Sequence, residues 1–318
     1  MATTFPLLML PLLVLKEIFK SMDLWSLVNL SVCSLKTRHA IKGFPTNVYV
    51  GARPNTFTIS QNAATFSMNI EDESETEPST EIVRMNRMAV RITRKQNEHW
   101  IIKNSVILDG WKLVMDHLLN TFQVDVNLEI VQERHLFEYL IEHPTKSRIE
   151  ELNVTSDFIN DVDMKFYLEN LNTGELCFSS NQNKTFRFNG QFGRFKVFTC
   201  SPAEWITREN FLSLDCEFID LERTSLTNED INMFLKKWVE GKSPELSEMR
   251  VEIERIDLIK IMDGIEILKE ASSGKENNAS FHVASELYIL NKDGLKGPFA
   301  TAANTFMFEV SSDNEDDN

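Results

Sequence analysis

The stretch that decides the N-terminal architecture is FPLLMLPLLVLKEIFKSMDLWSLVNLSVCSLKTRHAIK, residues 5–42. Apolar residues recur at helical spacing after Pro11, which can occupy the first turn of a helix. Asp23 interrupts the apolar run and is placed to cap a second short helix. The cluster is too small and too apolar to bury its own hydrophobic surface. It therefore predicts a compact helical module with one side that docks on a partner.

The same stretch resembles an F-box, a docking motif of about this length near a protein's N-terminus. The match consists of four pairs and two leucines: Leu10-Pro11, Ile18-Phe19, Met22-Asp23, Val32-Cys33, Leu27 and Leu30. Two features depart from the common pattern. Leu12 and Leu13 replace the acidic residue that often follows the Leu-Pro pair, and no aromatic residue stands around Lys36–His39. The divergent F-boxes of a family expanded in nematodes are similar in both respects.

An apolar run near an N-terminus can also be a secretion signal or a plain pair of core helices. The charged residues Lys16, Glu17, Lys20 and Asp23 interrupt this run, and no basic residue precedes it, which argues against a signal. The four cysteines are widely spaced and form no Cys-x-x-Cys pair, as reduced thiols do: Cys33, Cys177, Cys200 and Cys216. No run approaches the length of a membrane span. We expect a cytoplasmic and/or nuclear protein without a membrane partner.

Charge excludes another class of function. Lys and Arg number 33 against 48 Asp and Glu, for a formal net charge of −15. Phosphate-backbone binding needs a strongly basic surface, and no basic run of the sequence supplies one. We therefore expect no nucleic-acid partner.

After the helical module, short alternating runs predict strands over residues 47–110, a small β layer interrupted by the acidic stretch 71–81. From residue 111 helical and strand patterns alternate, and strand centres recur every roughly 20 to 30 residues. The expected elements include a helix at 205–211 and strands at 249–253 and 281–290. This spacing predicts leucine-rich-repeat-like α/β units over 111–310, with a doubly wound α/β domain as the alternative. We thus expect four parts: 1–46, 47–110, 111–310 and an acidic tail at 311–318.

Residues 211–241 predict a strand and then a capped helix that buries Ile231, Phe234, Leu235 and Trp238 before Gly241 ends it. With Asn-x-Phe-Leu-Lys-x-Trp at 232–238, this stretch resembles the type-2 F-box-associated domain of the same nematode-expanded family. Tyr288-Ile-Leu-Asn-Lys-Asp-Gly resembles that family's closing hairpin, although Asn291 replaces its usual basic residue.

Catalytic and metal-binding patterns are missing from the sequence. The six histidines show no ligand spacing, and Gly190-Gln-Phe-Gly193 is too short for a dinucleotide fingerprint. We expect no enzymatic activity, no catalytic residues, no metal site and no cofactor, with an unrecognised hydrolase as the last-ranked alternative.

The resemblance implies a substrate-recognition adaptor of a Skp-cullin-F-box ubiquitin ligase, which binds a Skp-family adaptor, and through it a cullin-RING ligase, and presents a target protein. Seven residues are predicted to form the adaptor-facing surface: Leu10, Pro11, Ile18, Leu27, Leu30, Val32 and Cys33. Four acidic residues at predicted strands are favoured for a target with a basic patch: Glu151, Glu175, Asp220 and Glu252. The alternative is an α/β repeat scaffold without a link to ubiquitin, whose N-terminal helices cap the array.

Overall fold

The computed structural model describes residues 7–42, 47–61, 64–72, 80–95, 99–130, 134–143, 148–172, 174–183, 185–269 and 287–310. The chain divides into two compact units, Met1–Leu152 and Asn153–Asn318. The division falls inside the strand β8 (Arg148–Ile159). The acidic tail at 311–318 and most of the acidic stretch, residues 73–79, lie outside the described residues.

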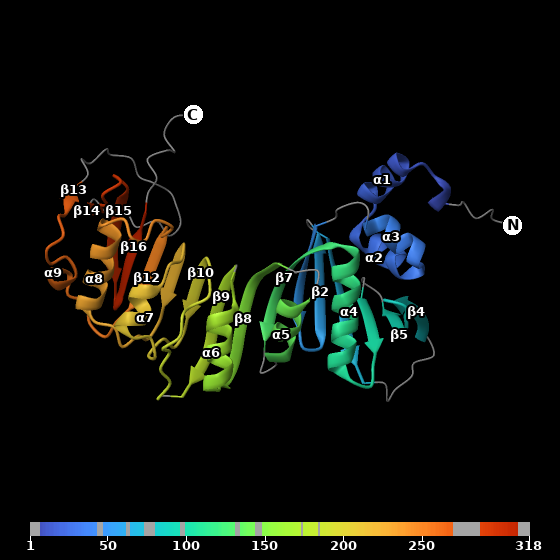
Figure 1. The fold of residues 1–318 in the computed structure, drawn as a ribbon, viewed down its shortest axis with the longest axis horizontal. Helices are drawn as coiled ribbons and strands as arrows, with labels where there is room; N and C mark the ends of the chain where they lie inside the picture. The colour runs from blue at the N-terminus through green and yellow to red at the C-terminus, as the bar shows by residue number, and fades with distance from the viewer. Residues whose placement is uncertain are drawn as a thin grey trace. The chain divides into compact units, whose positions relative to one another are not determined.

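Unit 1 begins with the helical module. Its elements are η1 (Leu7–Met9), α1 (Leu12–Ser21), α2 (Leu24–Cys33) and α3 (Leu35–Lys42) (Figure 1). Asp23 caps α2 as predicted, because its carboxylate accepts a hydrogen bond from the Ser26 backbone N–H at 2.7 Å. That hydrogen bond favours the charged carboxylate and so lowers the pKa of Asp23.

The rest of unit 1 is a mixed sheet with helices. Its elements are β1 (Asn47–Arg53), β2 (Thr56–Gln61), β3 (Ala64–Glu71), β4 (Thr80–Met85), β5 (Met88–Lys95), β6 (His99–Lys103), α4 (Ile107–Thr121), β7 (Gln123–Ile130) and α5 (Arg134–Glu142). The strand order is β7-β1-β2-β3-β6-β5-β4. β1 pairs in parallel with β7, so strands from both sides of residue 110 share one sheet. The boundaries expected at residues 46, 110 and 310 stay predictions.

Unit 2 contains the parallel array. Its elements after β8 are α6 (Asp161–Asn170), β9 (Glu175–Gln182), β10 (Val197–Cys200), α7 (Arg208–Ser213), β11 (Phe218–Leu221), α8 (Asn228–Val239), β12 (Glu248–Glu252), α9 (Leu258–Ile261), β13 (Leu268–Lys269), β14 (Leu287–Leu290), β15 (Lys296–Ala302) and β16 (Thr305–Glu309). β9, β10, β11 and β12 are parallel and adjacent in chain order. β16, β15 and β14 continue from β12 as antiparallel strands.

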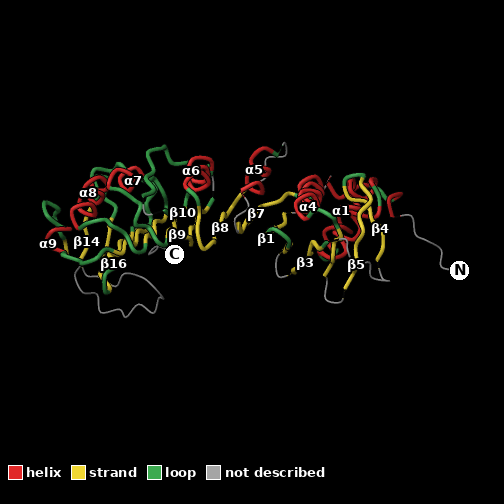
Figure 2. The backbone as a smooth tube through the Cα atoms, turned by 90° about the horizontal axis from the view of Figure 1, so that it is seen from below, coloured by secondary structure: helices red, strands yellow, loops and turns green. Residues whose placement is uncertain are grey.

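Topology favours the repeat-like architecture within unit 2. Figure 2 shows α6, α7 and α8 on the same side of the strands, whereas a doubly wound sheet carries helices on both faces. The predicted mixed α/β fold, a helical module followed by sheet, is confirmed. The connection between β9 and β10 departs from the alternation of strand and helix, because residues 185–196 form no helix or strand. They contribute an aromatic cluster instead, with Phe188 and Phe192 ring centroids 4.7 Å apart.

Some of the predicted bounds differ from those of the structure. The helix expected at 205–211 begins at Arg208, because Thr207 is its N-cap and exchanges hydrogen bonds with Asn210 in a capping box. β12 begins at Glu248, one residue earlier than expected. Of the strand expected at 281–290, only Leu287–Leu290 lies within the described residues, as β14.

Trp238 lies in the core of unit 2, as predicted. Its side chain is 1% exposed, and its ring meets the ring of Phe308 at 4.9 Å in a T-shaped arrangement. The contact needs Gly297, because a Cβ there would lie 2.3 Å from Phe308 and 3.0 Å from Trp238. The helix α8 is thereby packed against β15 and β16.

Replacing Trp238 by Ala is expected to lower the free energy of unfolding of unit 2 by about 3 to 5 kcal/mol, because the change leaves a large cavity between α8 and β16. The control is Met233→Ala on the same helix, where the side chain is largely exposed. Chemical denaturation of both variants provides the comparison. Equal midpoints for Trp238→Ala and the wild type would contradict the packing role of this ring.

Candidate functional site

The helical module exposes an apolar surface along η1 and α1. Leu15 and Phe19 face inward and are buried, while Met9 and Leu13 are 82% and 73% exposed. Val14 and Leu35 are also exposed. Large apolar side chains gathered in this way mark an interaction surface, because water solvates them poorly.

The seven predicted adaptor-facing residues divide by burial. Pro11 and Cys33 are exposed, whereas Leu10, Ile18 and Leu30 are partly exposed. Leu27 and Val32 are buried and support the module from inside. A role for these seven residues in adaptor binding stays a prediction.

Sequence reasoning missed Met9 and Leu13, although one signal was available. The run around Leu13 makes α1 apolar on more than one face, which a surface helix that covers only its own core does not need.

The module is joined to the sheet of unit 1 by aromatic rings. Trp25 of α2 meets Phe66 of β3 at 4.8 Å and Trp100 of β6 at 5.9 Å, both in T-shaped geometry. Phe66 and Trp100 themselves meet at 5.2 Å. Such aromatic pairs stabilise the folded chain by more than the burial of their apolar area alone. The apolar surface of η1 and α1 is therefore held on a rigid base.

A buried polar pair makes a second joint, between α2 and α4. The hydroxyl oxygen of Ser31 lies 2.7 Å from the carbonyl oxygen of Val28 and 2.8 Å from Nε2 of His117. A carbonyl only accepts, so the hydroxyl proton points to Val28, and Nε2–H of His117 donates to Ser31. Burial, followed by the charge of Arg38, lowers the pKa of His117 to about 3. The pair is therefore a neutral structural contact, since a nucleophilic serine would need the histidine as acceptor.

Unit 2 carries an acidic groove on the face of the sheet opposite its buried side chains. The groove has a volume of about 280 Å³ and is lined by Asp220, Leu221, Glu222, Glu248, Arg250, Glu252, Ala302, Thr305 and Met307. The strand register sets Asp220 beside Arg250, and Arg250 beside Met307. Arg250 forms an ion pair with Glu248 at 2.5 Å. Burial raises the pKa of Asp220, and the nearby Glu222 and Glu248 add to that effect while Arg250 opposes it.

Two of the four residues favoured for target binding, Asp220 and Glu252, line this groove together. Glu175 shares their face of the sheet but lies two strands away from Asp220 and three from Glu252, as the register through Val197 and Phe218 shows. Glu151 lies in unit 1, where it accepts a hydrogen bond from Nδ2 of Asn127 at 2.8 Å. A target-binding role for all four stays a prediction. The favoured set lacked Glu222 and Glu248, which also line the groove.

Within the described ranges, no three or more His, Cys, Asp or Glu side chains are grouped so as to hold a metal ion. No helix in the same ranges has both the length and the hydropathy of a membrane span.

Comparison with known proteins agrees with this arrangement. Residues 7–49 match the family model of the F-box domain. Residues 188–251, which include β11, α8 and part of the acidic groove, match the family model described as F-box associated. The expected resemblance to the nematode-expanded family with both domains is confirmed. F-box domains in general bind Skp-family adaptors within cullin-RING ligases, and both domain families are non-catalytic adaptor domains.

A relative in Caenorhabditis elegans is the Skn-1 dependent zygotic transcript 15 protein. It is 25% identical over 292 aligned residues, which cover 82% of this chain and 83% of the relative. The similarity thus extends through both units rather than through the F-box alone. No solved structure was found to match the chain.

The buried His117 predicts acid sensitivity of unit 1. Its pKa is lower in the folded chain than in the unfolded chain, so the unfolded state gains protons first as the pH falls. The contribution of the neutral ring to stability is complete above about pH 6.5 and is lost toward pH 3, at up to about 1.4 kcal/mol per pH unit. His117→Gln is expected to flatten this dependence of the unfolding free energy. The exposed His39→Gln serves as control, and an unchanged slope in His117→Gln would contradict the assignment.

Proposed function

We propose that this chain is a substrate-receptor subunit of a Skp-cullin-F-box ubiquitin ligase. The F-box binds a Skp-family adaptor through the surface of η1 and α1, and the acidic groove of unit 2 binds a target. The chain supplies proximity rather than chemistry, by holding a target lysine near ubiquitin activated on another subunit. We also propose a cytoplasmic or nuclear location, which the four free thiols support.

The observation that carries the adaptor proposal is the exposure of Met9 and Leu13 inside the matched F-box. Burying a side chain of this size contributes roughly 1.5 to 3 kcal/mol. The two together supply enough free energy to change an affinity by two orders of magnitude or more, before the cost of association. The aromatic joint through Trp25 adds to this, because a surface already fixed in place loses less entropy on binding.

Replacing Met9 and Leu13 together by Asp is expected to abolish co-purification with a recombinant Skp-family adaptor. The matched control is Val162→Asp on α6, which is 68% exposed on the outside of unit 2. Pull-down and calorimetry with the purified adaptor give the affinities. All variants change exposed side chains, so thermal midpoints near that of the wild type are expected to accompany the loss.

Two outcomes would overturn this proposal. One is adaptor binding by the double Asp variant with the wild-type affinity, and the other is absence of adaptor binding by the wild-type chain. In the second case the α/β repeat scaffold without a ubiquitin link is the better description.

For target recognition we propose that the acidic groove binds a basic segment of the target. Four carboxylates, those of Asp220, Glu222, Glu248 and Glu252, line the groove against the single guanidinium of Arg250. Arg250 already pairs with Glu248, which leaves a net negative cleft in a negatively charged chain. Negative clefts attract cationic segments and orient them. Asp220, whose pKa is raised, is half-buried in the lining of this groove.

Replacing Asp220 by Asn and Glu252 by Gln removes two charges with little change of shape. This double variant is expected to change the set of proteins captured by proximity labelling in cells, with selective loss of those that carry basic segments. The control replaces Glu204 and Glu245 by Gln, which removes two exposed charges outside the groove. An identical captured set for both variants and the wild type would remove the groove from target recognition. Adaptor binding measured in parallel keeps this result separate from the F-box proposal.

A further inference from the structure

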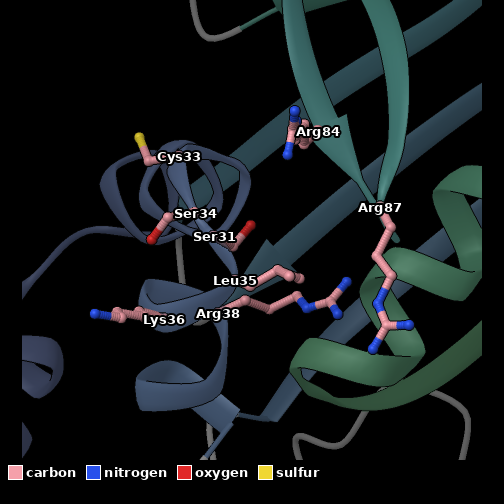
Figure 3. Close-up of a pocket in the computed structure, with 8 residues that line it drawn as sticks. All are labelled: Ser31, Cys33, Ser34, Leu35, Lys36, Arg38, Arg84 and Arg87. Carbon is pink, nitrogen blue, oxygen red and sulfur yellow. The ribbon is translucent and has the colours of Figure 1, made fainter.

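A second pocket lies in unit 1, between the F-box and the hairpin of β4 and β5. It has a volume of about 440 Å³ and is lined by Ser31, Cys33, Ser34, Leu35, Lys36, Arg38, Arg84 and Arg87 (Figure 3). The cations come from two places that are distant in sequence, the start of α3 and the end of the hairpin. No carboxylate is among the lining residues.

The charges of this pocket are not neutralised by the protein. Within the described ranges, none of Lys36, Arg38, Arg84 and Arg87 forms an ion pair. Elsewhere in unit 1 comparable arginines are paired, as Arg53 is with Glu129 at 2.6 Å. Four like charges at one pocket repel each other, which is unexpected in a chain with a net charge of −15. The repulsion is relieved when an anion enters.

The guanidinium group of Arg38 is also oriented by a hydrogen bond. Nη1 of Arg38 donates to Oδ1 of Asn86 at 2.7 Å, and this bond links α3 to the hairpin turn. Figure 3 shows Arg38 extending from α3 toward the hairpin, with Arg84 and Arg87 on the hairpin side. Lys36 and Cys33 point away from these three groups in the same view. The three arginines are therefore the functional set, and Lys36 belongs to the rim.

Arg87 occupies a backbone position that costs energy. The two-residue turn Asn86-Arg87 has φ values of 47° and 72°. Turns with both central residues at positive φ favour Asn-Gly, since glycine adopts this conformation without steric cost. An arginine in place of that glycine is strained, and strain of this kind concentrates at functional sites. The position thus retains a side chain that its backbone does not favour.

From these observations we propose that the pocket binds a phosphate group, carried by a phosphorylated serine or threonine of a protein or by a small phosphate compound. Guanidinium groups match phosphate oxygens with paired N–H donors, and those of Arg38, Arg84 and Arg87 line this one pocket. The pocket volume falls within the range of roughly 300 to 1,000 Å³ that holds small ligands. Leu35, exposed beside the arginines, offers an apolar contact for the group that carries the phosphate.

The test is a calorimetric titration of the full chain at low ionic strength. One arm uses inorganic pyrophosphate, and the other uses a phosphoserine peptide with its unphosphorylated form as reference. The wild type is expected to bind at least one phosphate probe saturably, with an affinity that falls as salt is added. Binding of pyrophosphate alone assigns the site to small phosphates, whereas tighter binding of the phosphopeptide assigns it to a modified protein.

Three variants make the result specific. Replacing Arg84 and Arg87 together (Arg84→Gln with Arg87→Gln) is expected to lower the affinity for the phosphate probe at least roughly tenfold, because two charged hydrogen-bond donors are lost. Lys16→Gln with Lys42→Gln, exposed lysines of the F-box outside the pocket, is expected to bind within roughly threefold of the wild type. Arg87→Gly is expected to weaken binding while its thermal midpoint stays at or above that of the wild type, since glycine relaxes the turn.

The Arg87→Gly result separates loss of a ligand contact from loss of folding. Absence of saturable binding of both probes to the wild type would overturn the proposal. So would equal phosphate affinities in the Arg84→Gln, Arg87→Gln variant and in the wild type.

Discussion

The structure of unit 1 depends on the contact of Trp25 with Phe66 and Trp100. A three-helix cluster of this size cannot bury enough apolar surface to be stable by itself. The indole of α2 solves this problem by entering a sheet whose own rings already pack together. The F-box is therefore continuous with the core of unit 1, and its Ser31–His117 contact repeats the connection at α4.

This attachment decides which side of the F-box faces solvent. One side of α2 packs against the sheet. The apolar surface that remains exposed is that of η1 and α1, around Met9 and Leu13. The same attachment brings α3 against the β4–β5 turn, where Arg38 reaches Asn86. The packing of the F-box against the sheet thus produces both a hydrophobic surface for one partner and a cationic pocket for another ligand.

Sequence periodicity predicted most helices and strands, because the apolar residues of α8 and of β9 to β12 follow the periods of their elements without interruption. The Asp23 cap and the buried Trp238 were predictable for the same local reason. Contacts between distant segments were not, since Trp25, Phe66 and Trp100 have no shared local signal. The basic pocket was not predicted, because Arg38 and Arg87 are 49 positions apart in the sequence and line the same pocket only in the folded chain. Of the four carboxylates that line the acidic groove, the sequence favoured Asp220 and Glu252 but not Glu222 and Glu248, because alternation along a strand does not indicate which residues of neighbouring strands meet in one groove.

The alternation of side chains in β9 to β12 has a consequence for how such proteins diversify. Positions of one parity, such as Ile219 and Leu221, are buried against the helices, while those of the other parity, such as Asp220, reach the open face. Mutations at open positions change what the sheet presents without disturbing its core, so selection for new binding partners and selection for folding act on separate sets of residues. A gene family can then multiply rapidly, with copies that keep one scaffold while their open faces diverge.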